Sequence, residues 1–307
     1  MRKKKVLILG VTASGKSRLS FELAESLQTE IISIDSMKVY RRMDIGTAKP
    51  PVEAQEKVKY HLIDVVEPSE SFNVNSFVEM TNEVIGQLEG SDKQVIAAGG
   101  TALYIKALLY GLFDGPGTDE RIREKLKAEA ESEGLGSLYS QLERIDPAAA
   151  ERIHPNDAKR VVRALEVYEL TGKPISSFQQ QWGQQRCDDW IVIGLRRERQ
   201  DESKRINARV KRMIESGLVD EVKSLLAEPK PLSKQARGAI GYAEIIDHLE
   251  GKMSLDEAVE MIKKNSRHLA KHQRTWFKTF NVNWLDIEEG EEPEQILARM
   301  KEIVLNF

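Results

Sequence analysis

The segment Val6–Ser17, VLILGVTASGKS, sets the expected fold of this chain. The apolar run Val6–Leu9 is followed at once by GVTASGKS, which fits the pattern G-x-x-x-x-G-K-[ST]. In that pattern a buried strand leads into a glycine-rich loop and then into a helix, and the loop N–H groups converge on a phosphate. The segment therefore predicts a phosphate-binding loop, and it leaves open which phosphate the loop holds.

The first hundred residues alternate between short β-rich runs and helical patterns. Apolar runs predict strands at 6–9, 30–34, 61–66 and 95–98, and helical patterns lie at 17–27 and 77–88. This alternation predicts an α/β fold of the phosphate-loop type, a parallel sheet flanked by helices. Residues 190–195 and 282–285 are expected to return to the same sheet.

The character of the sequence changes at about Gly115, where GPGTDE precedes a long helical stretch. We therefore predict a core domain of residues 1–114 and 186–307, and a helical insertion of residues 115–185. Within the insertion, His154–Pro174 is expected to form a helix capped by Asn156 or Asp157 and ended by Gly172 and Pro174.

Composition excludes several classes of protein. The chain has 307 residues, of which 40% are apolar and 31% charged, with a formal net charge of −3. One cysteine, Cys187, excludes an internal disulfide and a zinc site built from several cysteines. The N-terminal apolar run is too short for a secretory signal, and no run is long enough to span a membrane. We expect a cytoplasmic protein.

Two further polar groups follow predicted strands. Asp35 ends one strand, and Gly99-Gly100-Thr101 ends another. Ligands of open α/β sheets bind where the carboxyl ends of strands meet, so a carboxylate there can orient a group or accept a proton. In the loop itself, Lys16 reaches terminal phosphates and Ser17 can ligate Mg²⁺. The alternatives are that Asp35 caps a helix beginning at Ser36, and that Thr101 caps a tight turn.

Three helical segments carry clustered basic residues. They contain Lys159, Arg160 and Arg163; then Lys204, Arg205, Arg209 and Arg212; and finally Arg267, Lys271, Arg274 and Lys278. Such faces can contact RNA phosphates and give salt-dependent affinity. The alternative is that they are solvated helix faces paired with nearby acidic residues.

The ordered motifs together resemble one family. GVTASGKS, DSMKVYRRMDIGTAKP, YHLIDVVEP, AGGTALYIKALLYGL, IHPNDAKRVVRALEVYELTGKP, QARGAIGYAEI and SRHLAKHQRTWF follow one another in the spacing of the bacterial-type tRNA dimethylallyltransferases, also called tRNA isopentenyltransferases or the IPP transferase family. The resemblance covers about residues 5–280.

The resemblance implies a reaction. The loop would hold the diphosphate of dimethylallyl diphosphate with the help of Mg²⁺, and the prenyl group would pass to N6 of adenosine 37 in tRNAs that read codons starting with U. Asp35 would accept the proton, Thr101 would lie beside the amine, and Lys16 would stabilise the leaving diphosphate. The loop residues that match are Gly10, Val11, Thr12, Ala13, Ser14, Gly15, Lys16 and Ser17.

The resemblance also implies a tRNA surface. The insertion would grip the anticodon stem-loop, and the protein would act as a monomer without DNA or membrane partners. Positions expected to contact tRNA, from the family motifs or from the basic faces, are Asp35, Ser36, Met37, Lys38, Thr101, Arg123, Lys159, Arg160, Val161, Val162, Arg163, Arg267, Lys271 and Arg274.

Some residues depart from the family pattern, which commonly has Gln at Lys38, Pro at Val11, and Tyr and Arg at Leu269 and His272. Three other functions compete with the family reading. They are a phosphate-loop kinase that uses ATP, a prenyltransferase for free adenine nucleotides, and a non-catalytic RNA-binding protein.

Overall fold

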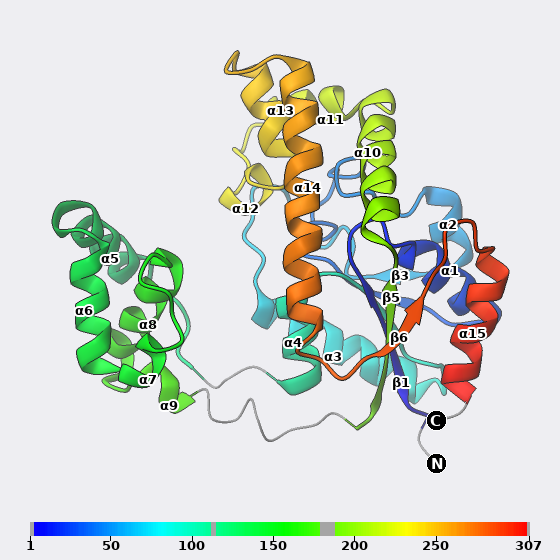
Figure 1. The fold of residues 1–307 in the computed structure, drawn as a ribbon, viewed down its shortest axis with the longest axis horizontal. Coiled ribbons are helices and arrows are strands. Elements are labelled where there is room, and N and C mark those ends of the chain that lie inside the picture. Colours follow the sequence, from blue (N-terminus) through cyan, green and yellow to red (C-terminus); the bar gives the residue numbers. More distant parts are fainter. Residues whose placement is uncertain (1–2, 112–114, 179–187, 306–307) are drawn as a thin grey trace. The chain divides into compact units, whose positions relative to one another are not determined.

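The computed structural model describes residues 3–111, 115–178 and 188–305. The chain divides into two compact units (Figure 1). The larger contains Met1–Leu109 and Asp188–Phe307, and the smaller contains Tyr110–Cys187.

The larger unit is built on a six-stranded parallel sheet with the order β3-β2-β4-β1-β5-β6. Gly99 lies in register with both Leu9 and Ile34, so three neighbouring strands end at one level of the sheet. The predicted α/β fold with a parallel sheet is confirmed. The strands are β1 (Lys5–Gly10), β2 (Ile31–Ile34), β3 (Tyr60–His61), β4 (Ile96–Gly99), β5 (Trp190–Arg196) and β6 (Asn283–Asp286).

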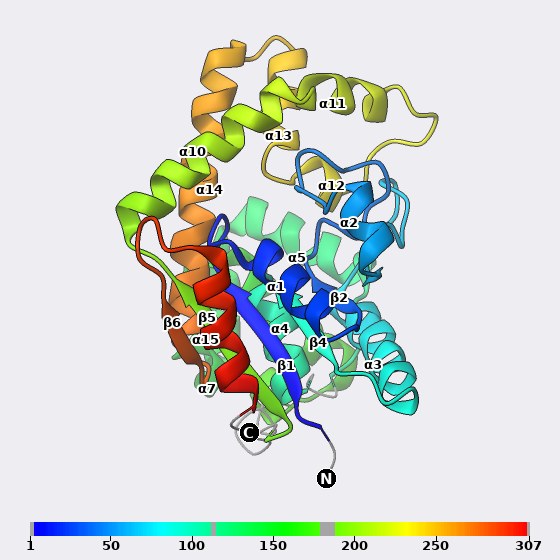
Figure 2. The same ribbon diagram turned by 90° about the vertical axis from the view of Figure 1, so that its right-hand side faces the viewer.

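Helices cover both faces of this sheet. Helices α1 (Lys16–Ser26) and α15 (Pro293–Leu305) lie on one side, and α3 (Val74–Gly90) and α4 (Ala102–Tyr110) lie on the other (Figures 1 and 2). Val6 and Ile8 belong to the apolar cluster that includes residues of α1 and α15. The alternate residues Leu7 and Leu9 are also fully buried, as expected for strands covered on both faces.

The remaining helices of the larger unit pack on one another. Helix α10 packs against α14, α14 against α13, and α13 against α11 and α12. Their bounds, with that of the separate short helix α2, are α2 (Val52–Lys57), α10 (Arg199–Glu215), α11 (Leu218–Leu226), α12 (Lys234–Arg237), α13 (Tyr242–Leu249) and α14 (Leu255–Phe277).

The smaller unit is helical, with a core formed mainly by α6 and α8. Its prominent helix begins after Asp157, whose side chain accepts a hydrogen bond from Arg160 N, and ends at Gly172, which has a φ of 67°. This confirms the predicted caps of that helix. The helices are α5 (Glu120–Glu133), α6 (Leu135–Ile145), α7 (Pro147–Ala150), α8 (Ala158–Thr171) and α9 (Ile175–Phe178).

The strand predicted at 61–66 is present as β3, but it spans only Tyr60–His61, so its predicted extent is wrong. Leu62 and Asp64 have φ values of 60° and 54°, a left-handed conformation that ends β3 after His61. Val66 then forms only an isolated bridge with Tyr40. Cys187 and the glutamine-rich segment 179–185 lie outside the described residues.

None of the described helices combines the length and the apolar character that crossing a lipid bilayer requires.

Candidate active site

The loop Gly10–Ser17 connects β1 to α1 and contains two residues in the left-handed conformation. Ala13 and Gly15 have φ values of 64° and 100°, and Ser14 N donates to Val11 O at 3.2 Å. A side chain at Gly10 would place its Cβ 2.5 Å from Ser14 Oγ. Gly15 precedes the first turn of α1 and has no side chain to cap it, so the N–H groups of that turn are available to an anion.

Three arginines donate hydrogen bonds to residues 12–14 of this loop, and we call them the arginine collar. Arg197 follows β5, and Arg205 and Arg209 lie one turn apart on α10. The sequence indicated Arg205 and Arg209 as RNA contacts, but their side chains are directed to the loop. The contacts are Arg209 to Thr12 Oγ1 at 3.2 Å, Arg205 Nε to Ala13 O at 2.9 Å, and Arg197 Nε to Ser14 O at 2.9 Å.

Asp35 lies at the end of β2, and its carboxylate closes a turn. The Oδ1 atom accepts hydrogen bonds from Met37 N at 2.8 Å and Lys38 N at 3.2 Å. Ser36–Lys38 form a turn and not a helix, so the alternative of a helix beginning at Ser36 is wrong. The carboxylate therefore orders the backbone of Met37 and Lys38.

Thr101 lies beside this turn. Its hydroxyl accepts a hydrogen bond from Ser36 N at 3.0 Å, so it connects the end of β4 to the end of β2. Gly99 permits this closeness, because an added Cβ there would lie 2.0 Å from Ile34 O. Gly100 N also donates to Ile34 O at 3.1 Å. Gly99 is thus required by the close approach of the two backbones.

A small cavity of about 30 Å³ brings the charged groups together. Its lining includes Lys16, Asp35 and Lys38. Burial lowers the pKa of Lys16 to about 7, and the neighbouring cations Lys38 and Arg209 add to this, while Asp35 opposes it. Burial also lowers the pKa of Lys38. Three basic side chains thus surround one carboxylate, and a bound anion would favour their protonated, charged forms.

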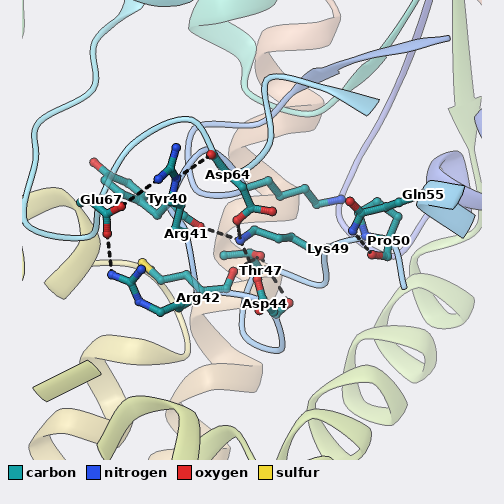
Figure 3. Close-up of polar contacts among 12 residues, drawn as sticks. Tyr40, Arg41, Arg42, Asp44, Thr47, Lys49, Pro50, Gln55, Asp64 and Glu67 are labelled. Atoms are coloured by element: carbon teal, nitrogen blue, oxygen red, sulfur yellow. Dashed lines mark hydrogen bonds and ion pairs between the residues drawn. The ribbon is translucent and has the colours of Figure 1, made fainter. Parts of the chain in front are cut away.

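The segment after Lys38 is fixed by its own polar network (Figure 3). Lys49, with 3% of its side chain exposed, bonds to Tyr40 O and Asp44 at 2.6 Å and to Asp64 at 2.5 Å. Nearby, Arg41 and Arg42 both contact Glu67. From α11, Glu221 accepts hydrogen bonds from the N–H groups of Asp44, Ile45 and Gly46. These contacts hold the chain that carries Lys38.

Gln273 is a site residue that sequence reasoning missed. It lies on the buried face of α14 and contacts both Thr12 and Gly100. The available signal was its spacing, since it falls between Ala270 and Phe277 on the face that the helix buries.

Some of the predicted tRNA contacts on α8 of the smaller unit are exposed, and others are buried. Lys159 and Arg160 are exposed, whereas Val161 is fully buried and Val162 is 8% exposed. The two valine side chains pack in the core, so side-chain contacts from Val161 and Val162 to RNA are incompatible with this structure. Arg163 donates to Pro116 O, Gly117 O and Glu166.

Glu166 is the centre of this arrangement, because its side chain is fully buried between two arginines. Arg123 lies 3.0 Å from Oε1 and Arg163 lies 2.6 Å from Oε2. Arg123 and Arg163 therefore compensate a buried carboxylate, whatever further contact they make with RNA.

The basic stripe on α14 is partly used within the larger unit. Arg267 donates to Asn207 at 2.8 Å, and Arg274 forms an ion pair with Glu202, both on α10. Lys271 is exposed. Arg267 and Arg274 therefore help α14 pack on α10, and their contact with tRNA stays a prediction.

A site for Mg²⁺ is compatible with the residues present. Ser17 is exposed in the first turn of α1 and lines the cavity, where its hydroxyl oxygen is a hard ligand. No group of three His, Cys, Asp or Glu side chains gathers within the described parts of the chain. An ion at Ser17 would therefore take most of its ligands from water and a bound diphosphate.

Comparison with known proteins assigns this chain to a family. The family model described as IPP transferase matches residues 38–280. A tRNA dimethylallyltransferase from Geobacter metallireducens is 48% identical over 277 residues, which are 89% of this chain and 89% of that protein. One from Acetivibrio thermocellus is 44% identical over 305 residues, covering 98% and 97% of the two chains.

Solved structures that are similar to this chain come from the same kind of protein. A tRNA isopentenylpyrophosphate transferase from Bacillus halodurans matches 99% of this chain and 97% of its own, with 39% identity and a TM-score of 0.71. A eukaryotic dimethylallyltransferase acting on tRNA matches 99% of this chain and 80% of its own, with 28% identity and a TM-score of 0.82.

Proposed function

This chain belongs to the IPP transferase family, and we propose that it transfers the dimethylallyl group of dimethylallyl diphosphate to N6 of adenosine 37 in tRNA. The products are N6-isopentenyladenosine and diphosphate, and the substrates are tRNAs that read codons starting with U. The observation that carries the proposal is that three strand-end loops place Lys16, Asp35 and Thr101 at one edge of the sheet.

The donor is held by its diphosphate. The N–H groups at the start of α1 and the Lys16 ammonium supply donors and positive charge, and the arginine collar fixes the loop that carries them. As the bond between the allylic carbon and the diphosphate oxygen breaks, negative charge grows on the diphosphate, where these groups stabilise it. Mg²⁺ bound at Ser17 would neutralise part of the same charge.

The acceptor is an exocyclic adenine amine, which is a weak nucleophile. Its nitrogen attacks the allylic carbon while its proton passes to the Asp35 carboxylate. Thr101 presents a hydroxyl beside Asp35 through its contact with Ser36, which suits it to orient the amine. The target base must leave the anticodon-loop stack to reach these groups.

The tRNA is expected to contact both units. Exposed Lys159 and Arg160 of α8 would contact the anticodon stem-loop, and exposed Lys271 would contact its backbone. One chain supplies every side chain named in the reaction, so we propose that it works as a monomer, in the cytoplasm where its tRNA substrate occurs.

The test is a product analysis. The protein is incubated with dimethylallyl diphosphate, Mg²⁺ and unmodified tRNA, and the digested nucleosides are examined by mass spectrometry. A prenylated adenosine is expected, and a matched tRNA with guanosine at position 37 should give none. An unmodified digest from both tRNAs would overturn the proposal. Prenylation of free adenine nucleotides in preference to tRNA would favour the small-acceptor alternative.

A further inference from the structure

Gln273 occupies a position where a helix normally places an apolar side chain. On α14 the buried residues include Ala270, Gln273 and Phe277, which are three and four residues apart and therefore share one face. Gln273 is 7% exposed. A buried amide is costly unless both of its ends are hydrogen-bonded, so the partners of Gln273 indicate why the position is polar.

Both ends of the amide are used, and by different loops. The Oε1 atom accepts a hydrogen bond from Thr12 N at 2.8 Å, and Nε2 donates to Gly100 O at 2.9 Å. A backbone N–H can only donate and a carbonyl can only accept, so these two partners fix the orientation of the amide. One side chain therefore bridges the phosphate-binding loop and the loop that ends in Thr101.

The surrounding residues make this bridge specific. An added Cβ at Gly100 would lie 2.5 Å from Gln273 Nε2, so the glycine is needed for the amide to reach its carbonyl. The hydroxyl of Thr12 is held from α10 by Arg209, while its N–H is held from α14 by Gln273. Thr101, which follows Gly100 directly, is in turn bonded to the turn after β2.

We propose that Gln273 is a positioning residue. It fixes the phosphate-binding loop Gly10–Ser17 and the loop that ends in Thr101 in one relative arrangement, so that the allylic carbon and the adenine amine meet in line. This inference rests on the proposed function for the identity of the two substrates. Gln273 acts through Thr12 and Gly100 and does not itself touch the reacting atoms.

The experiment compares Gln273→Met, Gln273→Glu and a matched control, Gln295→Met. Methionine preserves the size of the side chain but leaves both backbone partners without a bond. Glutamate still accepts from Thr12 N but presents an oxygen to the carbonyl of Gly100. Gln295 is an exposed glutamine on α15, where the same chemical change meets no buried partner. The measurements are kcat, KM for each substrate, affinity for inorganic diphosphate, affinity for tRNA, and thermal stability.

Both Gln273 variants are expected to bind inorganic diphosphate roughly fivefold to tenfold more weakly and to lose kcat by roughly tenfold or more, the scale of one or two lost hydrogen bonds. Their affinity for tRNA should match that of the wild type, and Gln295→Met should leave every constant unchanged. Gln273→Glu should be at least as defective as Gln273→Met.

Kinetic constants and diphosphate affinity that stay at wild-type values in folded Gln273→Met would overturn the inference. So would losses that merely follow the fraction of unfolded protein, because a structural role alone predicts an equal loss of tRNA binding. If the wild type makes no prenylated tRNA, the proposed function fails, and the diphosphate titration still tests whether Gln273 positions the loop.

Discussion

The substitution Asp35→Asn separates the two tasks of this side chain. In the structure, Oδ1 of Asp35 accepts hydrogen bonds from Met37 N and Lys38 N at 2.8 and 3.2 Å. The carbonyl oxygen of an asparagine accepts the same two bonds, so the turn is expected to persist. What is lost is the negative charge and the ability to take a proton from the amine.

The effects of Asp35→Asn on kcat and on KM can be worked out from the role of Asp35 and from the charges around it. Loss of a positioned general base costs roughly a factor of 10² to 10⁴ in turnover. The removed charge lies among Lys16, Lys38 and Arg209, so the site becomes more positive and should bind diphosphate at least as well as before. The loss is therefore expected in kcat, with no rise in KM for dimethylallyl diphosphate.

The assay is steady-state transfer of the prenyl group to tRNA, with separate titrations of inorganic diphosphate and tRNA. Asp92→Asn, at an aspartate that is 91% exposed, serves as the control. Asp35→Ala should add a stability loss of about 1–3 kcal/mol, because two backbone N–H groups then lose their acceptor. Near-normal kcat in Asp35→Asn would refute the assignment of Asp35 as the proton acceptor.

The remaining predictions concern charges around the two substrates. Lys38→Gln removes one cation from the cavity and should raise KM for dimethylallyl diphosphate without abolishing transfer; an unchanged KM in steady-state assays would exclude Lys38 from the diphosphate site. Lys159→Ala should weaken tRNA binding and reduce its salt dependence by about one phosphate contact. An unchanged salt slope in filter binding would show that Lys159 lies on a solvated helix face and contacts no phosphate. Arg163→Ala should lower the free energy of unfolding by about 1–3 kcal/mol in denaturant unfolding, because Glu166 loses one charged partner while Arg123 still compensates its charge. Glu166→Gln combined with it should recover part of the loss.

Patterns of local sequence predicted much of the framework. The loop Gly10–Ser17, Asp35 and Thr101 each follow a buried strand, and parallel strands necessarily bring their carboxyl ends to one edge. Strand order was not contained in those patterns. The pairing of β4 between β1 and β2 is what places Thr101 beside Asp35.

Residues that act over long distances in sequence were harder to predict. Arg205 and Arg209 read as part of a basic helix face, and only the packing of α10 shows that they bond to the loop near the start of the chain. Nothing in the sequence around Arg197 indicated that its side chain bonds to the phosphate-binding loop. Gln273 stood on the face of α14 that is buried, yet its partners lie 261 and 173 residues away.

Two local errors have a common cause in backbone conformation. The apolar character of residues 61–66 favours a strand, but the left-handed φ angles of Leu62 and Asp64 end it after two residues. Likewise, Asp35 has the chemistry of a helix cap, yet its acceptor bonds close a turn that no helix follows. Neither outcome is determined by hydrophobic periodicity, because both depend on contacts with neighbouring strands and loops.

In the proposed reaction, the loop Gly10–Ser17 holds the diphosphate of a prenyl donor and does not cleave ATP. The most direct measurement supplies dimethylallyl diphosphate, ATP, Mg²⁺ and unmodified tRNA together, and counts prenyl groups transferred, diphosphate released and ATP remaining. We expect one diphosphate to be released for each prenylated adenosine, with the ATP intact. Consumption of ATP to ADP with no prenylated tRNA would contradict it and would assign the loop to a phosphoryl-transfer enzyme.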